Sequence, residues 1–275
     1  MIPKKIIFYW GSWKMSWLRY LTLKSFIHLN PDWEVILYIE DNNCKMEWKI
    51  ERQDFTYYKG KNYFSDVEKL NIDIREYEDK VSTECAIYKS DFFRWNMLSN
   101  CFYADMDILF TQPMNKIYED LKNQDVIITW SSHFSIGFLG SSKNSFFSNV
   151  YDWAKHIADY KRYQSVGIES LHNEIFNIKG NSKQYDRSLI KKTNMPMYLK
   201  QKYPNLNFYN LSMDTLYNLQ PRNLKQLYVD IIPLNPKLGI HWYAGHPMSQ
   251  RYNNIITPNS KHICTLTKAI KELNL

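Results

Sequence analysis

The sequence predicts an α/β protein whose mostly parallel sheet is flanked by helices, and two observations carry this prediction. Strand signals and amphipathic helix signals alternate through the first half of the chain. The chain has 275 residues, of which 44% are hydrophobic and 16% aromatic. That content supports a large core and excludes a disordered protein. We therefore expect a single domain over residues 1–275.

The first half of the chain pairs apolar strand runs with helix patterns. The run Lys4–Trp10 is too short for a signal sequence and is typical of a buried strand. Residues 17–29 carry apolar side chains near helical spacing, and Asn30-Pro31 ends that helix. We further expect a helix over 83–98 with Thr83 as its N-cap, and strands over 33–39, 72–77, 101–107, 125–130 and 136–139.

The second half is less regular and more helical. Helices are expected over 143–158, over 184–202 with a break at Pro196, and over 260–273. Short strands are expected over 206–211 and 238–242. No repeat and no convincing linker divides the sequence, which agrees with one domain.

Cysteine usage and hydropathy indicate the compartment. The four cysteines lie far apart in the sequence and form no Cys-X-X-Cys pair. No run approaches the roughly 20 apolar residues that cross a membrane. We therefore expect a reduced, cytoplasmic protein without a transmembrane segment.

Positive charge is concentrated in one segment, although the whole chain carries +7. Residues 179–202 hold seven bases and one acid, Asp186, for a net charge of +6. This pattern is typical of a solvated helix face or of a docking surface for a polyanion such as nucleic acid, lipopolysaccharide or an anionic membrane. The candidate polyanion- or acceptor-binding residues are Lys183, Arg187, Lys191 and Lys192.

Two aspartates, Asp105 and Asp107, follow an apolar strand run and are themselves followed by apolar chain. Strand side chains alternate between faces, so we expect both carboxylates on the same side. Two like charges beside a core are costly unless a cation neutralises them, and a divalent ion shared with substrate phosphates would do so. The alternative is a pair of solvated turn residues.

Asp91 and Arg94 lie three residues apart on the helix before this strand, and therefore on one helix face. One interpretation is an ordinary surface ion pair. The other is a ligand-binding pair in which Asp91 holds ribose hydroxyls and Arg94 grips phosphate oxygens.

From Glu84 to Phe110 the chain resembles the segment of metal-dependent, nucleotide-sugar glycosyltransferases that carries their DXD motif. The likeness is to the retaining families that include fungal cell-wall mannosyltransferases, capsular sugar transferases and the large clostridial toxin catalytic domains. Ser99-Asn100 stand where the family usually has Gly-Gly. The matching residues are Ser90, Asp91, Arg94, Tyr103, Asp105 and Asp107.

Both ends of the chain extend the resemblance. Residues 2–10 are similar to the family's opening strand, which implies that Trp10 contacts the nucleotide base. Residues 241–247 are similar to the family's closing His-Trp-x-x-Gly segment. This implies that His241, or failing that His246, completes a metal shell with the aspartates. A nitrogen ligand beside carboxylates suits Mn²⁺, with Mg²⁺ as the alternative.

Two weaker likenesses concern the sugar. Residues 172–177 loosely resemble the Asp-Gln-Asp-x-Leu-Asn motif of retaining transferases, although His172 departs from the first Asp. The likeness implies that Asn173 and Glu174 position the sugar or stabilise an oxocarbenium-like transition state; the alternative is a polar helix start. By the same resemblance, residues 135–138, beginning with Ser135, would line the donor sugar pocket.

The resemblance thus implies a GT-A-like, Rossmann-like fold with a donor-binding half over 1–130 and a basic, acceptor-binding half over 131–275. The implied reaction moves a sugar, with retention, from a nucleoside-diphosphate sugar (a UDP-sugar is favoured) to an acceptor hydroxyl. The acceptor would be a cell-surface glycan, a lipid-linked sugar or another polyanion, with peripheral membrane contact left open. One alternative is a transferase acting on hydroxymethylated bases of phage DNA. Another is a catalytically inactive module that binds nucleotide sugars or nucleic acid.

Overall fold

A computed structural model describes residues 1–40, 58–78, 81, 83, 85–143, 145–178 and 186–275. The chain forms two compact units that interleave along the sequence. Unit 1 comprises Met1–Ile7, Glu78–Ala104 and Ile117–Met213, and unit 2 comprises Phe8–Tyr77, Asp105–Lys116 and Asp214–Leu275. The expected single domain, with halves that meet at residue 130, stays a prediction.

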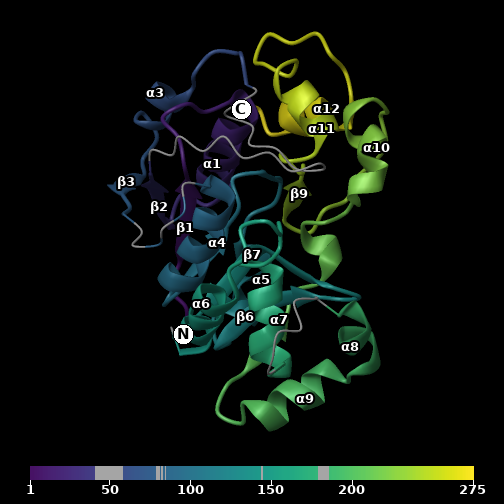
Figure 1. Ribbon diagram of the computed structural model, residues 1–275. Helices are drawn as coiled ribbons and strands as arrows, with labels where there is room; N and C mark the ends of the chain where they lie inside the picture. Colours follow the sequence, from purple (N-terminus) through teal and green to yellow (C-terminus); the bar gives the residue numbers. More distant parts are fainter. Residues whose placement is uncertain (41–57, 79–80, 82, 84, 144, 179–185) are drawn as a thin grey trace. The chain divides into compact units, whose positions relative to one another are not determined.

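Unit 1 contains the start of β1 (Lys5–Trp10) and the strands that follow it in the sheet. Strand β7 is antiparallel to both β4 and β6, whereas β1 with β4 and β6 with β8 pair in parallel. These strands are β4 (Cys101–Ala104), β6 (Val126–Trp130), β7 (Phe134–Ser141) and β8 (Phe208–Asn210). The helices are α4 (Ala86–Met97), α5 (Asn115–Leu121), α6 (Ser145–Ile157), α7 (Ile168–Phe176), α8 (Arg187–Lys192) and α9 (Met195–Lys202) (Figure 1).

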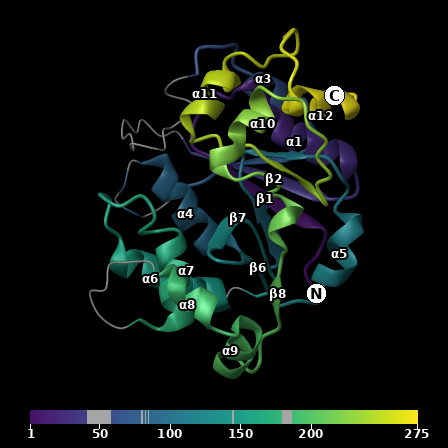
Figure 2. The same cartoon turned by 90° about the vertical axis from the view of Figure 1, so that its right-hand side faces the viewer.

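Unit 2 contains the end of β1, a parallel pair formed by β2 (Glu34–Ile39) and β3 (Asp73–Glu76), and an antiparallel pair formed by β5 (Ile108–Phe110) and β9 (Gly239–His241). In both views α10 lies beside α11 and α12 (Figures 1 and 2). The helices are α1 (Trp17–Leu29), α3 (Phe64–Val67), α10 (Leu224–Tyr228), α11 (Pro247–Asn253) and α12 (Thr265–Glu272), with 3₁₀ turns η1 (Met213–Thr215) and η2 (Pro221–Asn223).

Hydrogen bonding orders the seven strands of the large sheet as β3-β2-β1-β4-β7-β6-β8. Among the described strand pairings of this large sheet, only those of β7 are antiparallel. Strands joined by helical crossovers form such a sheet because parallel neighbours cannot be linked by tight turns. The predicted α/β class, with a mostly parallel sheet flanked by helices, is confirmed.

Helix α1 shows how local sequence and core packing agree. The Ser16 hydroxyl accepts a hydrogen bond from the Arg19 backbone N–H at 3.3 Å, which caps the helix start. At its other end, the Asn30 amide donates to the Phe26 carbonyl at 2.8 Å. Phe26 packs edge-on against Phe110, with 4.9 Å between ring centroids. Because Phe110 belongs to β5, this contact anchors the helix beside the turn that precedes β5.

Three local expectations differ from the structure. Strand β4 ends at Ala104, so Asp105 and Asp107 lie in the turn before β5 and not within a strand. The helix expected over 184–202 is two helices, and Pro196 lies in the first turn of α9, where its missing N–H costs nothing. Cys85, not Thr83, is the N-cap of α4; the Thr83 hydroxyl instead accepts from the Cys85 N–H at 3.2 Å.

Two further expectations concern cysteines and membranes. Cys85, Cys101 and Cys264 are buried and in the thiol form, whereas Cys44 lies outside the described residues. Across the described ranges, no helix combines the length and the apolarity needed to cross a bilayer.

Candidate functional site

A short antiparallel ladder in unit 2 brings His241 to the two aspartates. Ile108 of β5 pairs with His241 of β9, and the Trp242 N–H donates to the Asp107 carbonyl at 2.9 Å. The ladder needs Gly239, since a Cβ there would lie 2.7 Å from the Leu109 carbonyl oxygen. The pairing therefore places the imidazole of a residue far along the chain directly beside Asp107.

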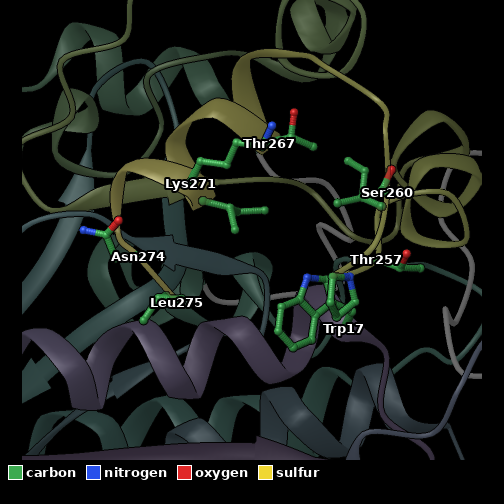
Figure 3. Close-up of a pocket in the computed structure, with 10 residues that line it drawn as sticks. Trp17, Thr257, Ser260, Thr267, Lys271, Asn274 and Leu275 are labelled. Atoms are coloured by element: carbon green, nitrogen blue, oxygen red, sulfur yellow. The ribbon is translucent and has the colours of Figure 1, made fainter.

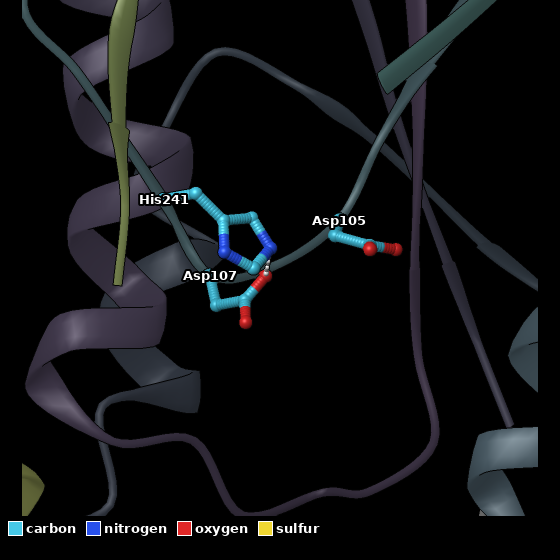
Figure 4. Close-up of side chains that lie close together, drawn as sticks. All are labelled: Asp105, Asp107 and His241. Atoms are coloured by element: carbon cyan, nitrogen blue, oxygen red, sulfur yellow. Dashed lines mark ion pairs between the residues drawn. The ribbon is translucent and has the colours of Figure 1, made fainter. Parts of the chain in front are cut away.

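Asp105, Asp107 and His241 each offer one ligand atom, and these atoms all lie within 4.8 Å of one another (Figure 4). Asp107 and His241 are buried, whereas Asp105 is partly exposed. The His241 Nε2 atom lies 3.2 Å from Asp107 Oδ1, and the Ala244 N–H donates to Asp107 Oδ2 at 2.9 Å. The turn and the ladder thus produce the clustering expected from the sequence, but not through strand alternation.

The surroundings of Asp107 keep its carboxyl group ionised. Burial by itself raises the pKa of Asp107, but the His241 imidazole, the Arg19 guanidinium and the Ala244 N–H outweigh it and hold that pKa well below its usual range. An ionised carboxylate is the form that ligates a hard cation.

Arg19 is a member of this site that sequence reasoning missed. Its guanidinium carbon lies 4.8 Å from the centroid of the Trp10 ring and 5.1 Å from that of the Trp242 ring. Two tryptophans therefore hold a cation near Asp107. The only sequence signal is a lone charged residue in the otherwise uncharged run 17–23.

Aromatic side chains also orient His241. Its ring centroid lies 4.9 Å from that of Tyr217 and 4.3 Å from that of Tyr243. Tyr243 has a φ of 51°, which is unusual for a bulky residue, and its hydroxyl donates to the Leu219 carbonyl at 2.7 Å. Packing therefore fixes the direction of the imidazole before any ligand binds.

The donor set fits a divalent cation. Two carboxylates and one imidazole are the ligand types of Mn²⁺, Mg²⁺ and related ions, and the nitrogen favours the transition metal. A metal ion ligates the deprotonated, neutral imidazole, and in that form the three side chains carry two negative charges, which a divalent ion would balance.

Asp91 and Arg94 are brought together in unit 1 as a buried pair and not as a surface pair. Arg94 Nη2 lies 3.1 Å from Asp91 Oδ1, with both side chains under a tenth exposed. The guanidinium also donates to the Ile136 carbonyl at 2.8 Å and lies 4.8 Å from the Tyr103 ring centroid. These contacts are structural in kind, and the expected donor-binding roles of Asp91, Arg94 and Tyr103 stay predictions.

Asn173 and Glu174 lie in the second half of α7 and are both buried. Glu174 accepts hydrogen bonds from Tyr203 at 2.7 Å and from the Trp153 Nε1–H at 3.1 Å. The carboxylate therefore links α7 to α6 and to the end of α9. The role of both residues at the sugar remains a prediction, as does that of Ser135, a buried residue of β7.

Two lysines of the basic segment 179–202 bind backbone carbonyls of the protein itself. Lys200 donates to the Pro204 carbonyl at 3.1 Å and Lys202 to the Ile175 carbonyl at 2.9 Å. Three candidates, Arg187, Lys191 and Lys192, lie exposed on α8, and Lys183 lies outside the described residues.

A separate pocket of about 280 Å³ lies in unit 2 between the start of α1 and the C-terminal helix (Figure 3). Trp17, Ser260 and Lys271 are among its lining residues. None of the site residues expected from the sequence lines this pocket.

Comparison with known proteins gives structural neighbours only. No protein-family model and no curated protein matches the chain. Solved structures that match include the PaToxG glycosyltransferase, at 15% identity and a TM-score of 0.44 over 73% of this chain and 77% of that chain. Another is the galactosyltransferase LgtC in complex with donor and acceptor sugar analogs, at 15% identity and a TM-score of 0.37 over 62% of this chain and 70% of that chain.

Proposed function

We propose that this protein is a metal-dependent glycosyltransferase of GT-A-like fold that moves a sugar from a nucleoside-diphosphate sugar to an acceptor hydroxyl. The observation that carries the proposal is the clustering of Asp105, Asp107 and His241, with ligand atoms within 4.8 Å of one another. Two of these residues form the DXD-like motif and the third opens the His-Trp-x-x-Gly-like segment.

Asp105, Asp107 and His241 would hold the metal, with Mn²⁺ favoured over Mg²⁺ because of the imidazole. A bound divalent ion supplies charge stabilisation to a leaving diphosphate. The chain itself orients Asp107 through the Ala244 N–H and directs His241 through Tyr217 and Tyr243.

Other residues supply binding and positioning. Trp10 is the proposed contact of the nucleotide base, and Arg19 lies over its ring. We keep Asp91, Arg94, Tyr103 and Ser135 as proposed donor-binding residues, and Asn173 and Glu174 as proposed sugar-positioning residues. A UDP-sugar donor and retention of configuration complete the proposal on the strength of the family resemblance.

Exchange of one carboxylate tests the metal hypothesis. The proposal expects Mn²⁺-dependent hydrolysis or transfer from a UDP-sugar by the unchanged protein, and loss of at least a hundredfold in Asp107→Asn. The matched control is Asp120→Asn, which changes an exposed aspartate of α5 and should leave turnover unchanged. Equal turnover in both variants would refute the metal hypothesis.

The same assay separates the inactive-module alternative. Thermal shifts with nucleotide sugars and Mn²⁺ report binding irrespective of turnover. Stabilisation by a donor without any hydrolysis or transfer would indicate a binding module and not an enzyme.

The proposal extends to an anionic acceptor, which the exposed basic side chains of α8 support. Duplex DNA with hydroxymethylated bases is one such acceptor, and a cell-surface glycan is the other. A gel shift with duplex DNA should be salt-sensitive and should weaken in Lys191→Glu/Lys192→Glu if DNA is the acceptor. Absence of salt-sensitive binding would favour the glycan.

A further inference from the structure

We propose that unit 2 carries a peripheral membrane-docking surface, distinct from the group formed by Asp105, Asp107 and His241 and independent of the proposed function. Three large apolar side chains are exposed around the end of α10 and the start of α12. The exposed fractions are 44% for Val229, 57% for Ile231 and 62% for Ile263. We call Val229, Ile231 and Ile263 the apolar tip.

Hydrogen bonds hold the two backbone segments of the apolar tip together. The Thr265 N–H donates to the Asp230 carbonyl at 2.9 Å, and the Ile232 N–H donates to the Thr265 hydroxyl oxygen at 3.0 Å. The two segments also meet before these residues, where the His262 Nε2 atom lies 2.7 Å from the Tyr228 carbonyl oxygen. Because neighbours on both sides are tied across the two segments, Ile231 and Ile263 are presented from a preformed scaffold and not from a loose loop.

Basic side chains accompany the apolar tip. Segments 224–232 and 260–268 contain the lysines Lys225, Lys261 and Lys268, all exposed, against the single acid Asp230. The two segments therefore carry a net charge of +2, with histidine taken as neutral. Lysine ammonium groups are most stable in contact with water and anions, whereas isoleucine side chains are most stable in an apolar phase.

An anionic lipid surface is the partner that satisfies both requirements. Isoleucine side chains can insert among acyl chains while lysines contact the charged headgroups. A second copy of the chain fits less well, since a twofold interface through the apolar tip would bring the lysines of both copies together. The arrangement needs no membrane-spanning helix.

Vesicle sedimentation with the full chain tests the proposal. We expect binding to vesicles of phosphatidylcholine with phosphatidylglycerol, little binding to phosphatidylcholine alone, and release at high salt. Ile231→Ser/Ile263→Ser should weaken binding at least about tenfold. Lys261→Gln/Lys268→Gln should weaken it about fivefold per lysine and flatten its salt dependence.

Met197→Ser is the matched control, because Met197 is exposed to 57%, as Ile231 is, but lies on α9 of unit 1. Retained vesicle binding by this variant, with loss in the isoleucine variant at unchanged thermal stability, supports the proposal. Equal binding to neutral and anionic vesicles would overturn it. So would a concentration-dependent dimer, seen by sedimentation equilibrium, that Ile231→Ser/Ile263→Ser converts to monomer without any vesicle binding by the unchanged protein.

Discussion

The candidate metal-ligand group of unit 2 (Asp105, Asp107 and His241) and the Asp91–Arg94 pair of unit 1 use similar side chains but balance their charges differently. In unit 1 one carboxylate faces one guanidinium at 3.1 Å, and a backbone carbonyl accepts another N–H of that guanidinium. In unit 2 two carboxylates lie near one imidazole, and the Arg19 guanidinium, which acts electrostatically on Asp107, lies over two tryptophan rings.

Charge balance distinguishes the two groups, because the Asp91–Arg94 pair is neutral by itself whereas the Asp105–Asp107–His241 cluster is the candidate for neutralisation by a bound cation. A pair whose charges cancel stabilises the folded state only while both partners remain. A cluster with excess negative charge gains most when a cation arrives from solution. Substitutions of Asp91 or Arg94 should therefore lower the free energy of unfolding in addition to their proposed effect on donor binding, whereas substitutions of Asp105, Asp107 or His241 should act mainly on metal binding.

The largest expected effect on stability is that of Arg94→Ala. Removing the guanidinium takes away the buried ion pair with Asp91 at 3.1 Å, which should cost about 3–5 kcal/mol in the free energy of unfolding. Urea denaturation measures this cost. Arg222→Ala, which changes an exposed arginine, should cost less than about 0.5 kcal/mol. Similar costs for the two variants would mean that Asp91 and Arg94 do not form a buried pair.

Gly167→Ala should have the next largest effect. A Cβ at position 167 would lie 2.7 Å from Asp91 Oδ2 and 3.0 Å from Ile136 Cδ1, so the carboxylate or the backbone must move. We expect a loss of about 1–3 kcal/mol in the free energy of unfolding. In an Asp91→Ala background the same change should cost clearly less, because the contact is gone. Full additivity in this double-mutant cycle would contradict the tight packing of Gly167 on Asp91.

Arg19→Gln tests the electrostatics of unit 2. Loss of the cation near Asp107 should tighten binding of Mn²⁺ alone, because a repulsive charge is removed. It should lower kcat/KM for a nucleotide sugar about tenfold, because a positive charge beside the proposed metal–diphosphate site is lost. Calorimetry and donor hydrolysis measure the two effects. Lys24→Gln, which removes a cation over Tyr20 on the same helix, should change neither. Parallel weakening of metal and donor in Arg19→Gln would contradict this placement of charge.

The smallest expected effect is a pH dependence that comes from His172 in unit 1. Burial lowers the pKa of the His172 imidazole below its ordinary value, and its Nε2 atom lies 3.1 Å from the Asp186 carbonyl oxygen. Below about pH 6.5 the unfolded state therefore binds more protons, and stability falls as the pH drops.

The free energy of unfolding, measured at pH 7.5 and at pH 5.5, gives the loss of stability between these two pH values. His172→Gln should reduce this loss, by less than about 1 kcal/mol. A residual slope should persist, because burial also lowers the pKa of His133 and of His246. His156→Gln, at an exposed site, is the control. An unchanged slope in His172→Gln would contradict the buried neutral imidazole.

Local patterns were sufficient for much of the secondary structure. Helix α1 spans Trp17–Leu29, as expected, because its apolar spacing, its Ser16 cap and its Asn30-Pro31 stop all lie within a few residues of the helix itself. Helices α5, α10 and α11 were not expected, since each is only five to seven residues long and has too few turns for a clear period.

Residue types and flanking motifs were sufficient to predict the α/β class and to single out Asp105, Asp107 and His241. How these residues meet depends on the β5–β9 ladder, which joins segments more than a hundred residues apart. The burial of Asp91 and Arg94 and the position of Arg19 over two tryptophan rings also emerge only from long-range packing. Propensity, capping and alternation act over a few neighbouring residues, whereas burial and charge compensation depend on which distant segments pack together.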